Sequence, residues 1–477
     1  MKAHNIVFYS LAVIALLVIA IFSLLYRVDA NPLCIWDEAR VAVSALEMSQ
    51  SHNYFIPTYD GSPDMWSVKP PLMVIVQSFS MKLFGYNELG ARMPSVIAAF
   101  ATLGLLFWFC IRILKNFIAG FCVVLFLCTS SGYVCEHVAR SGDYDTLLIF
   151  FLTAYFIFAL TFILTKRYKL YLLFNVFLLL AVFTKGIGGV FFLPGIFLVF
   201  ITEKNMLREL FSPKFILPPA IVFICFIAYY LIRETYNTGY IHTVIFEEMQ
   251  GRLFDSRFDT NNTWYYFFES MVSSTFNPWW ILIPLSIPVY FNVDTTERKV
   301  ILGTFFTLII FWIPLTISIN KNFWYNAPAI PLLSLLAALT FSKIILFLIQ
   351  KIDSRLFQKA VIVVTICLLS IMPCRTIFNN SSKLNEHIGF AELIKSNRIK
   401  SGTKIISKGY NSPILFYQKA MMIRGTTVLV NEMDAVKEGD TVIVLSLFDI
   451  NEMKQHYQCE VLFAMKETEM LYLKSKI

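Results

Sequence analysis

Charged residues are scarce in this chain of 477 residues. They make up 15% of the sequence and hydrophobic residues make up 57%, whereas a soluble domain usually carries about 25% charge and about 45–50% apolar residues. Apolar runs of about 20 residues recur, which is the length needed to cross a bilayer core of about 30 Å. The shortage of charge therefore excludes a soluble enzyme with one anchor and predicts an α-helical polytopic membrane protein.

The usual signatures of metal and phosphate-loop sites are also missing. The 9 cysteines form no CxxC pair and no Cys/His metal spacing, and most lie in apolar runs, where cysteine behaves as a small hydrophobic residue. The C-terminal region contains no Gly-rich phosphate loop, and no obvious internal repeat is visible. The net charge of +8 comes from basic residues in short loops, which indicates membrane orientation rather than binding of nucleic acid.

About eleven apolar segments are predicted to cross the membrane. The segment Leu72–Phe84 is apolar but too short to cross, so it is predicted to be a membrane-surface or re-entrant helix. The predicted spans cover about residues 6–26, 94–112, 117–134, 146–165, 170–184, 187–202, 215–232, 279–292, 300–319, 327–349 and 360–373.

The basic residues divide the loops into two sets. The loops after spans two, four, six, eight and ten each carry two or three Lys or Arg near the span ends, which assigns them to the cytoplasm by the positive-inside rule. The remaining loops, including the long outer loops 28–93 and 233–277, then face outward, and every polar cluster of chemical interest falls on that side. We therefore expect a multi-pass protein of a bacterial-type inner membrane with a periplasmic active site.

The chain is predicted to contain two domains. Residues 1–378 form a transmembrane catalytic domain, and residues 379–477 form a small soluble α/β domain on the outer face. In this second domain, segments 384–397 and 451–457 have helical patterns, whereas segments 404–407, 441–446, 460–465 and 470–473 read as strands.

Two adjacent acids, Asp37 and Glu38, follow the first span. A carboxylate there could accept the proton of an attacking hydroxyl group. The alternative is structural, because Asp commonly caps a helix and Asp37 would share a helix face with Arg40. The residues alone favour neither interpretation.

Several cations are predicted to gather on the outer face: Lys69, Arg92, Arg140, Lys185, Arg252 and Lys321. Such a set suits a phosphate or pyrophosphate whose tail lies in lipid. Interfacial lysines and binding of anionic headgroups are the alternatives. Asp143 and Asp145 could, with Asp37, hold a divalent cation or share acid–base work.

Several stretches, in order along the first 350 residues, resemble the GT-C glycosyltransferases. They are WDEAR at 36–40, PTYDG at 57–61, KPPL at 69–72, FG at 84–85 with RMPS at 92–95, Arg140 with Asp145, FTKG at 183–186, 248–252, and 321–325 with Pro328. The resemblance is to family 39, the protein O-mannosyltransferase type, and to the related transferase that puts aminoarabinose on lipid A.

This resemblance implies transfer, with inversion, of a sugar from a polyprenyl-phosphate donor to an extracytoplasmic lipid, glycan or protein acceptor. Asp37 matches the family's acid that acts as base or orients the acceptor, Asp145 matches its second Asp, and Glu38 joins them as a catalytic candidate. Positions near the donor phosphate are matched by Arg40, Lys69, Lys321 and Tyr325, and Tyr59, Arg92, Arg140, Lys185 and Arg252 complete the candidate binding set. Val68 stands where lipid A relatives carry an acid, which argues against a metal site of their kind.

Two other functions fit a polytopic protein of this composition. A transporter or flippase for lipid-linked sugars should show inverted repeats and charges near the bilayer midplane, whereas the charges here gather at span ends. A non-catalytic envelope scaffold would use the outer α/β domain to bind a partner.

Overall fold

The computed structural model describes residues 3–135, 137–203, 206–251, 263–350, 371, 388–407, 410–431 and 435–477. Contacts divide the chain into two compact units. The helical unit comprises Met1–Tyr26, Met65–Met73 and Ser95–Asn380, and the mixed unit comprises Arg27–Asp64, Val74–Pro94 and Ser381–Ile477. Helices α3 (Leu72–Phe84) and α4 (Glu88–Trp108) contribute residues to both units.

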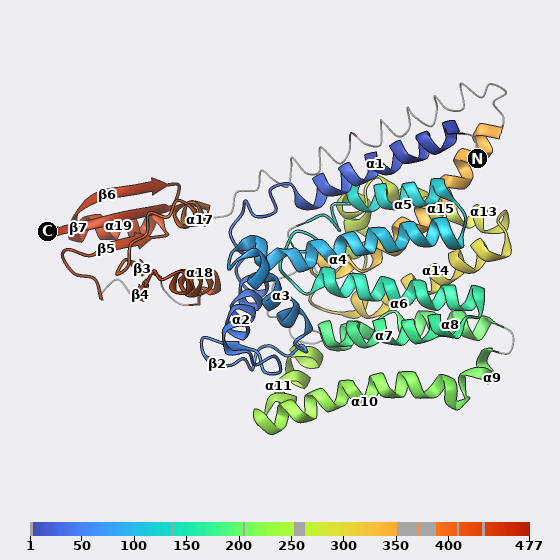
Figure 1. Ribbon diagram of the computed structural model, residues 1–477, viewed down its shortest axis with the longest axis horizontal. Helices are drawn as coiled ribbons and strands as arrows, with labels where there is room; N and C mark the ends of the chain where they lie inside the picture. Colours follow the sequence, from blue (N-terminus) through green and yellow to red (C-terminus); the bar gives the residue numbers. More distant parts are fainter. Residues whose placement is uncertain are drawn as a thin grey trace. The chain divides into compact units, whose positions relative to one another are not determined.

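The helical unit is built from helices that lie side by side (Figure 1). Helix α6 packs against α7, α5 against α15 and α1, α8 against α14, α10 against α7, and α13 against α15. The bounds are α1 Ala3–Leu25, α5 Phe117–Thr129, α6 Asp145–Thr165, α7 Tyr168–Lys185, α8 Leu193–Thr202, α9 Met206–Leu210, α10 Pro213–Tyr236, α11 Tyr240–Ile245, α12 Tyr266–Ser270, α13 Leu282–Phe291, α14 Thr295–Ile317 and α15 Ala329–Gln350. Short 3₁₀ or π-helical turns occupy Phe109–Ile113, Gly186–Val190, Phe246–Gly251, Met271–Thr275, Trp279–Ile281 and Phe323–Asn326.

Local sequence signals set the ends of several helices. Asn116 and Asp294 cap α5 and α14, and each side chain accepts a hydrogen bond of 2.9 Å from a backbone N–H in the first turn. Such caps satisfy N–H groups that have no partner inside the helix. Helix α7 ends because Gly186 adopts a φ of +55°, which a residue with a Cβ rarely tolerates. The last side chain of α7 is therefore that of Lys185.

Six helices in the described part of the chain are long and apolar enough to cross a membrane. They are Glu88–Ile113, Asp145–Thr165, Tyr168–Val190, Pro213–Tyr236, Thr295–Ile317 and Ala329–Gln350. Shorter apolar helices lie at Ser10–Leu25, Leu72–Phe84, Phe117–Thr129, Leu193–Thr202 and Trp279–Phe291. The first ten predicted spans each fall on one of these helices, and 72–84 is the separate short helix that the sequence predicts. The eleventh span, at 360–373, lies outside the described residues except for position 371, so the number of crossings stays a prediction.

The mixed unit joins the first loop to the C-terminal part of the chain. From the loop come α2 (Asp37–Ser51) and a hairpin of β1 (Thr58–Tyr59) and β2 (Ser62–Pro63). The C-terminal part contributes α17 Ile388–Lys395, β3 Lys404–Ile406, α18 Ser412–Ile423, β4 Leu429–Asn431, β5 Thr441–Val444, α19 Leu447–His456, β6 Tyr457–Met465 and β7 Thr468–Lys476.

The C-terminal strands form one sheet in the order β4-β3-β5-β7-β6 (Figure 1). Strand β3 runs parallel to β4 and β5, with Ile405 beside Val430 and Ile443, and β7 runs antiparallel to β5 and β6. Buried residues of the sheet pack with Ile450 and Met453 of α19. The predicted α/β composition is confirmed, although α18 and β4 were not anticipated.

Helix α18 packs against α2. The C-terminal segment thus packs against the loop that carries Asp37. The domain boundary at 378 remains a prediction.

Candidate active site

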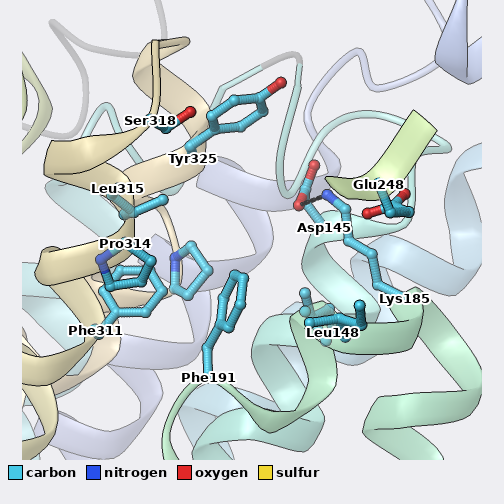
Figure 2. Close-up of a pocket in the computed structure, with 13 residues that line it drawn as sticks. Asp145, Leu148, Lys185, Phe191, Glu248, Phe311, Pro314, Leu315, Ser318 and Tyr325 are labelled. Carbon is cyan, nitrogen blue, oxygen red and sulfur yellow. Dashed lines mark hydrogen bonds and ion pairs between the residues drawn. The ribbon is translucent and has the colours of Figure 1, made fainter. Parts of the chain in front are cut away.

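A pocket in the helical unit lies among α6, α7, α14 and the segments that follow them. It encloses about 1050 Å³ of empty space, including the part open to solvent. Figure 2 shows polar side chains at one end and mainly apolar side chains at the other. The polar end contains Asp145, Lys185, Glu248, Ser318 and Tyr325, and the apolar end contains Leu148, Phe191, Phe311 and Pro314. The pocket therefore suits a molecule with a charged head and an apolar tail.

Asp145 and Lys185 form an ion pair at the polar end. Asp145 is the first residue of α6 and Lys185 the last residue of α7, and the packing of the two helices brings them together. Only 5% and 13% of these side chains are exposed. Each charge also has the sign that its helix terminus favours. The pair therefore fixes an ammonium and a carboxylate together in the pocket wall.

Lys69 lies next to the residue that precedes α6. Its Nζ is 4.5 Å from the centre of the Tyr144 ring, directly before Asp145. The backbone just before Lys69 is held in place. The carbonyls of Ser67 and Val68 accept hydrogen bonds from the hydroxyls of Tyr240 and Tyr230, at 2.8 and 3.3 Å. Lys69 thus joins the charged groups that the helical unit gathers at this end of α6.

The segment after α14 brings two further predicted residues. Tyr325 lines the pocket from a 3₁₀ turn, and the neighbouring Asn326 accepts a hydrogen bond of 2.7 Å from the indole N–H of Trp312 in α14. Lys321 lies between Ser318 and Tyr325 and is 4% exposed. Burial lowers its pKa, because a low-polarity environment disfavours the charged form.

Arg140 and Asp143 make contacts with the backbone. The Arg140 guanidinium donates to the carbonyls of Ser23 and Tyr26, at 3.0 and 2.7 Å, where α1 ends. The carboxylate of Asp143 accepts from the N–H of Tyr144 at 2.6 Å. Among the residues that the structure describes, no group of three or more His, Cys, Asp or Glu is placed to hold a metal ion.

In the mixed unit, the adjacent acids Asp37 and Glu38 have different environments. Asp37 is exposed in the first turn of α2, whereas Glu38 is 3% exposed. The Glu38 carboxylate accepts from the N–H of Cys34 at 2.7 Å and pairs with Arg92. Of the two acids, Asp37 is therefore the one that an incoming molecule can reach.

Arg92 directs all five of its N–H groups to acceptors within the mixed unit. Two go to the Glu38 carboxylate, at 2.7 and 2.9 Å. The others go to the carbonyls of Val28, Asn31 and Pro32, at 2.7–2.9 Å. A guanidinium has five donors, so Arg92 in this conformation is committed to holding the loop rather than to a ligand.

Arg40 lies in a cluster of polar and aromatic residues. It pairs with Asp64 through two hydrogen bonds, of 2.6 and 3.1 Å, and its guanidinium carbon lies 4.2 Å from the centre of the Tyr59 ring. Burial alone would lower the pKa of Arg40, but the hydrogen bonds and charge of Asp64 outweigh it and raise that pKa. Tyr410 of the C-terminal segment also reaches Arg40, with its hydroxyl 3.4 Å from Nη1.

The predicted candidates therefore fall into two groups. In the helical unit, Asp145, Lys185 and Tyr325 line one pocket and Lys69 lies next to Tyr144. In the mixed unit, Asp37, Glu38, Arg40, Tyr59 and Arg92 surround the start of α2. Arg252 lies outside the described residues.

Sequence reasoning missed several residues around these groups. Ser318 lines the pocket, and Glu248 was only part of a matched stretch. Tyr410 and Tyr417 of the C-terminal segment belong to no predicted site. Asn411-Ser412-Pro413 is a helix-start signal, and it could have located the helix that carries Tyr417.

Comparisons with known proteins match parts of the chain to a family model and to a relative. Residues 68–232 match the family model described as dolichyl-phosphate-mannose-protein mannosyltransferase. An uncharacterized protein from Aquifex aeolicus (strain VF5) is 25% identical over 254 residues, which cover 53% of this chain. That match spans about half of the relative, or 49% of its length.

Two solved structures of one protein resemble the chain over nearly its whole length. ArnT from Cupriavidus metallidurans bound to undecaprenyl phosphate matches with a TM-score of 0.67 at 14% identity, over 99% of this chain and 98% of that one. The apo state of the same protein gives a TM-score of 0.65 at 14% identity, over 98% of each chain.

A second solved protein is more distant. The archaeal oligosaccharyltransferase AglB from Archaeoglobus fulgidus, in complex with an inhibitory peptide and a dolichol-phosphate, gives a TM-score of 0.53 at 11% identity, over 97% of this chain and 74% of that one. These likenesses confirm the GT-C fold and the similarity to ArnT, and with the apolar helices they identify a multi-pass membrane protein.

Proposed function

We propose that the chain is an integral-membrane glycosyltransferase that moves a sugar from a polyprenyl-phosphate donor to an extracytoplasmic acceptor, with inversion at the anomeric carbon. One observation carries this proposal. A pocket with Lys185, Tyr325 and two carboxylates at its polar end and phenylalanine side chains at the other has a polar and an apolar half, as a lipid phosphate does. The bound undecaprenyl phosphate in ArnT and the dolichol-phosphate in AglB support the same donor class.

On the donor side, the residues of the helical unit would stabilise the leaving phosphate. Lys185 and Tyr325 line the pocket, and Lys69 lies beside Tyr144 at the start of α6. As the bond between the anomeric carbon and the phosphate oxygen breaks, negative charge grows on that oxygen. Cations and hydroxyls fixed in advance stabilise such charge without reorganising during the reaction. Asp145 has a positioning task, because its ion pair holds the Lys185 ammonium in place.

On the acceptor side, we assign the base to Asp37. The acceptor oxygen forms a bond to the anomeric carbon, its hydroxyl proton passes to the Asp37 carboxylate, and polyprenyl phosphate departs. One displacement of this kind inverts the anomeric centre and needs no covalent intermediate. Glu38 is a neighbour of Asp37 in sequence only, since its pairing with Arg92 gives it a structural task.

This assignment narrows the set of phosphate-binding candidates. Arg92 and Arg140 hold backbone carbonyls and are assigned to the fold. Arg40 is paired with Asp64 beside Tyr59, which suits a role at the acceptor rather than at the lipid phosphate. Lys69, Lys185, Lys321 and Tyr325 remain as the donor set.

The test is transfer by purified protein in lipid nanodiscs. A panel of undecaprenyl-phosphate-linked sugars is supplied with an extract of envelope lipids and glycans, and mass spectrometry follows release of undecaprenyl phosphate and mass gain of the acceptor. Asp37→Asn should slow transfer by about 10²–10⁴-fold, the usual contribution of a general base. Asp29→Asn is the matched control, because Asp29 is an exposed carboxylate of the same loop.

Wild-type rates in the Asp37→Asn protein would overturn the assignment of the base. Movement of the intact donor across the bilayer, with no product, would identify a flippase instead.

A further inference from the structure

The C-terminal segment contacts the loop that carries Asp37 on several sides. The Tyr410 ring stacks on the Trp36 ring with centres 5.1 Å apart. Lys419 pairs with Glu47 of α2 at 3.0 Å, and the Lys395 ammonium donates to the carbonyl of Asp29 at 2.7 Å. These contacts come from three separate parts of the C-terminal segment, and they hold the loop between Asp29 and Glu47.

Tyr417 makes the most enclosed of these contacts. Its side chain is 3% exposed, and its hydroxyl donates to Glu88 at 2.9 Å while accepting from the N–H of Leu33 at 3.1 Å. Burial, together with the charge of Glu88, raises the pKa of Tyr417 far above its usual value, so the phenol stays neutral and keeps its proton for Glu88. The Tyr417 hydroxyl thus connects α18, the start of α4 and the segment that leads into α2.

The next residue of that chain is fixed in turn. The N–H of Cys34 donates to the Glu38 carboxylate, which Arg92 holds from α4. Two consecutive backbone N–H groups, at Leu33 and Cys34, are therefore fixed just before Trp36 and Asp37. The fixation matters because Trp36 has a φ of +74°, a conformation that an L residue keeps only when its surroundings impose it. The indole offers no acceptor that could cap α2.

We propose that Tyr417 is a positioning residue, through which the C-terminal segment holds the Leu33–Arg40 chain in the conformation that presents Asp37. The expected effect of Tyr417 on the reaction rests on the proposed function, whereas its contact with Leu33 and Glu88 does not. The C-terminal segment is then an integral part of the acceptor side of the site, rather than an appended domain.

The variant that tests this is Tyr417→Phe, which removes one oxygen and keeps the ring. Tyr457→Phe is the matched control, because the Tyr457 hydroxyl donates to the carbonyl of Val436 within the C-terminal sheet, at 3.2 Å. Both full-length proteins are compared in nanodiscs by hydrogen–deuterium exchange of the peptide that covers 33–40. Exchange of the peptide that covers α6 reports any general loosening.

Exchange over 33–40 should accelerate by about tenfold in Tyr417→Phe, the effect of losing a hydrogen bond between a buried hydroxyl and a carboxylate. Tyr457→Phe should leave it unchanged, and neither variant should alter α6. In the transfer assay, Tyr417→Phe should lower kcat by a similar factor, with an unchanged Kd for undecaprenyl phosphate, since the donor groups belong to the helical unit.

Unchanged exchange over 33–40, or equal acceleration in α6, would overturn the proposal. A fall in donor affinity that matches the fall in kcat would also contradict it. If the wild-type protein transferred no sugar, the proposed function would fail, and the exchange data would still decide whether Tyr417 holds this segment.

Discussion

Replacing Lys185 with methionine tests the donor pocket at its most constrained point. The substitution keeps the length of the side chain and removes the charge, which leaves the buried Asp145 carboxylate without its ion-pair partner. Removing one partner of a buried ion pair typically costs about 3–5 kcal/mol. We therefore expect a loss of about 3–5 kcal/mol in the free energy of unfolding.

A second substitution separates stability from binding. In Lys185→Met combined with Asp145→Asn, no buried charge is left unpaired, so stability should return to within about 1 kcal/mol of wild type. The affinity for undecaprenyl phosphate should not return. Loss of a hydrogen bond to a charged group costs about 1.5–3 kcal/mol, which corresponds to an approximately 10–100-fold weaker Kd.

The assays are thermal unfolding and titration of undecaprenyl phosphate in nanodiscs. Lys166→Met is the matched control, because Lys166 pairs with Glu203 at 3.2 Å but is half exposed, and a pair of that kind is worth about 0.2–1 kcal/mol. Wild-type affinity in both Lys185 variants would rule out phosphate binding through this lysine.

Three further predictions address other parts of the structure. Because burial lowers the pKa of Lys321, its charge is lost at a lower pH than that of an exposed lysine. Affinity for undecaprenyl phosphate should therefore fall as the pH rises through that lowered value. Lys321→Arg should remove this pH dependence. Gly186→Ala should lower the unfolding temperature, because φ is +55° and a Cβ would lie 3.0 Å from the Tyr230 hydroxyl, at a cost of about 1–3 kcal/mol. Gly104→Ala, in open space within α4, should instead stabilise by up to about 1 kcal/mol. Arg92→Met should destabilise the protein by about 3–5 kcal/mol, because it removes the ion pair of the buried Glu38 carboxylate. Adding Glu38→Gln should recover part of the loss in the same unfolding assay.

The helical part of the fold could be predicted because its signals are local. An apolar run sets the existence of each helix, and cap residues such as Asn116 and Asp294 set its start. Asp145 could be placed at a helix start and Lys185 at a helix end from their neighbours alone. Asp145 and Lys185 pair because α6 packs against α7. This packing could be anticipated, since consecutive antiparallel helices commonly pack together.

The division of roles among the charged residues could not be read from the sequence. Asp37 and Glu38 are adjacent and chemically similar. Glu38 is set apart because it binds the N–H of Cys34 and is paired with Arg92, 54 positions along the chain. Arg92 and Arg140 looked like phosphate ligands, since a positive charge in an outer loop gives no sign of the carbonyls that surround it. The contact of Tyr417 with Leu33 spans 384 positions, and no local pattern encodes a partner at that distance.

The central claim is that the pocket lined by Asp145, Lys185 and Tyr325 binds the phosphate of the lipid-linked donor. A structure of the protein in nanodiscs with undecaprenyl phosphate tests it directly. We expect phosphate oxygens within hydrogen-bonding distance of the Lys185 ammonium and the Tyr325 hydroxyl, with the prenyl chain beside Phe191 and Phe311. A phosphate bound elsewhere, with this pocket occupied only by the lipid of the disc, would contradict it.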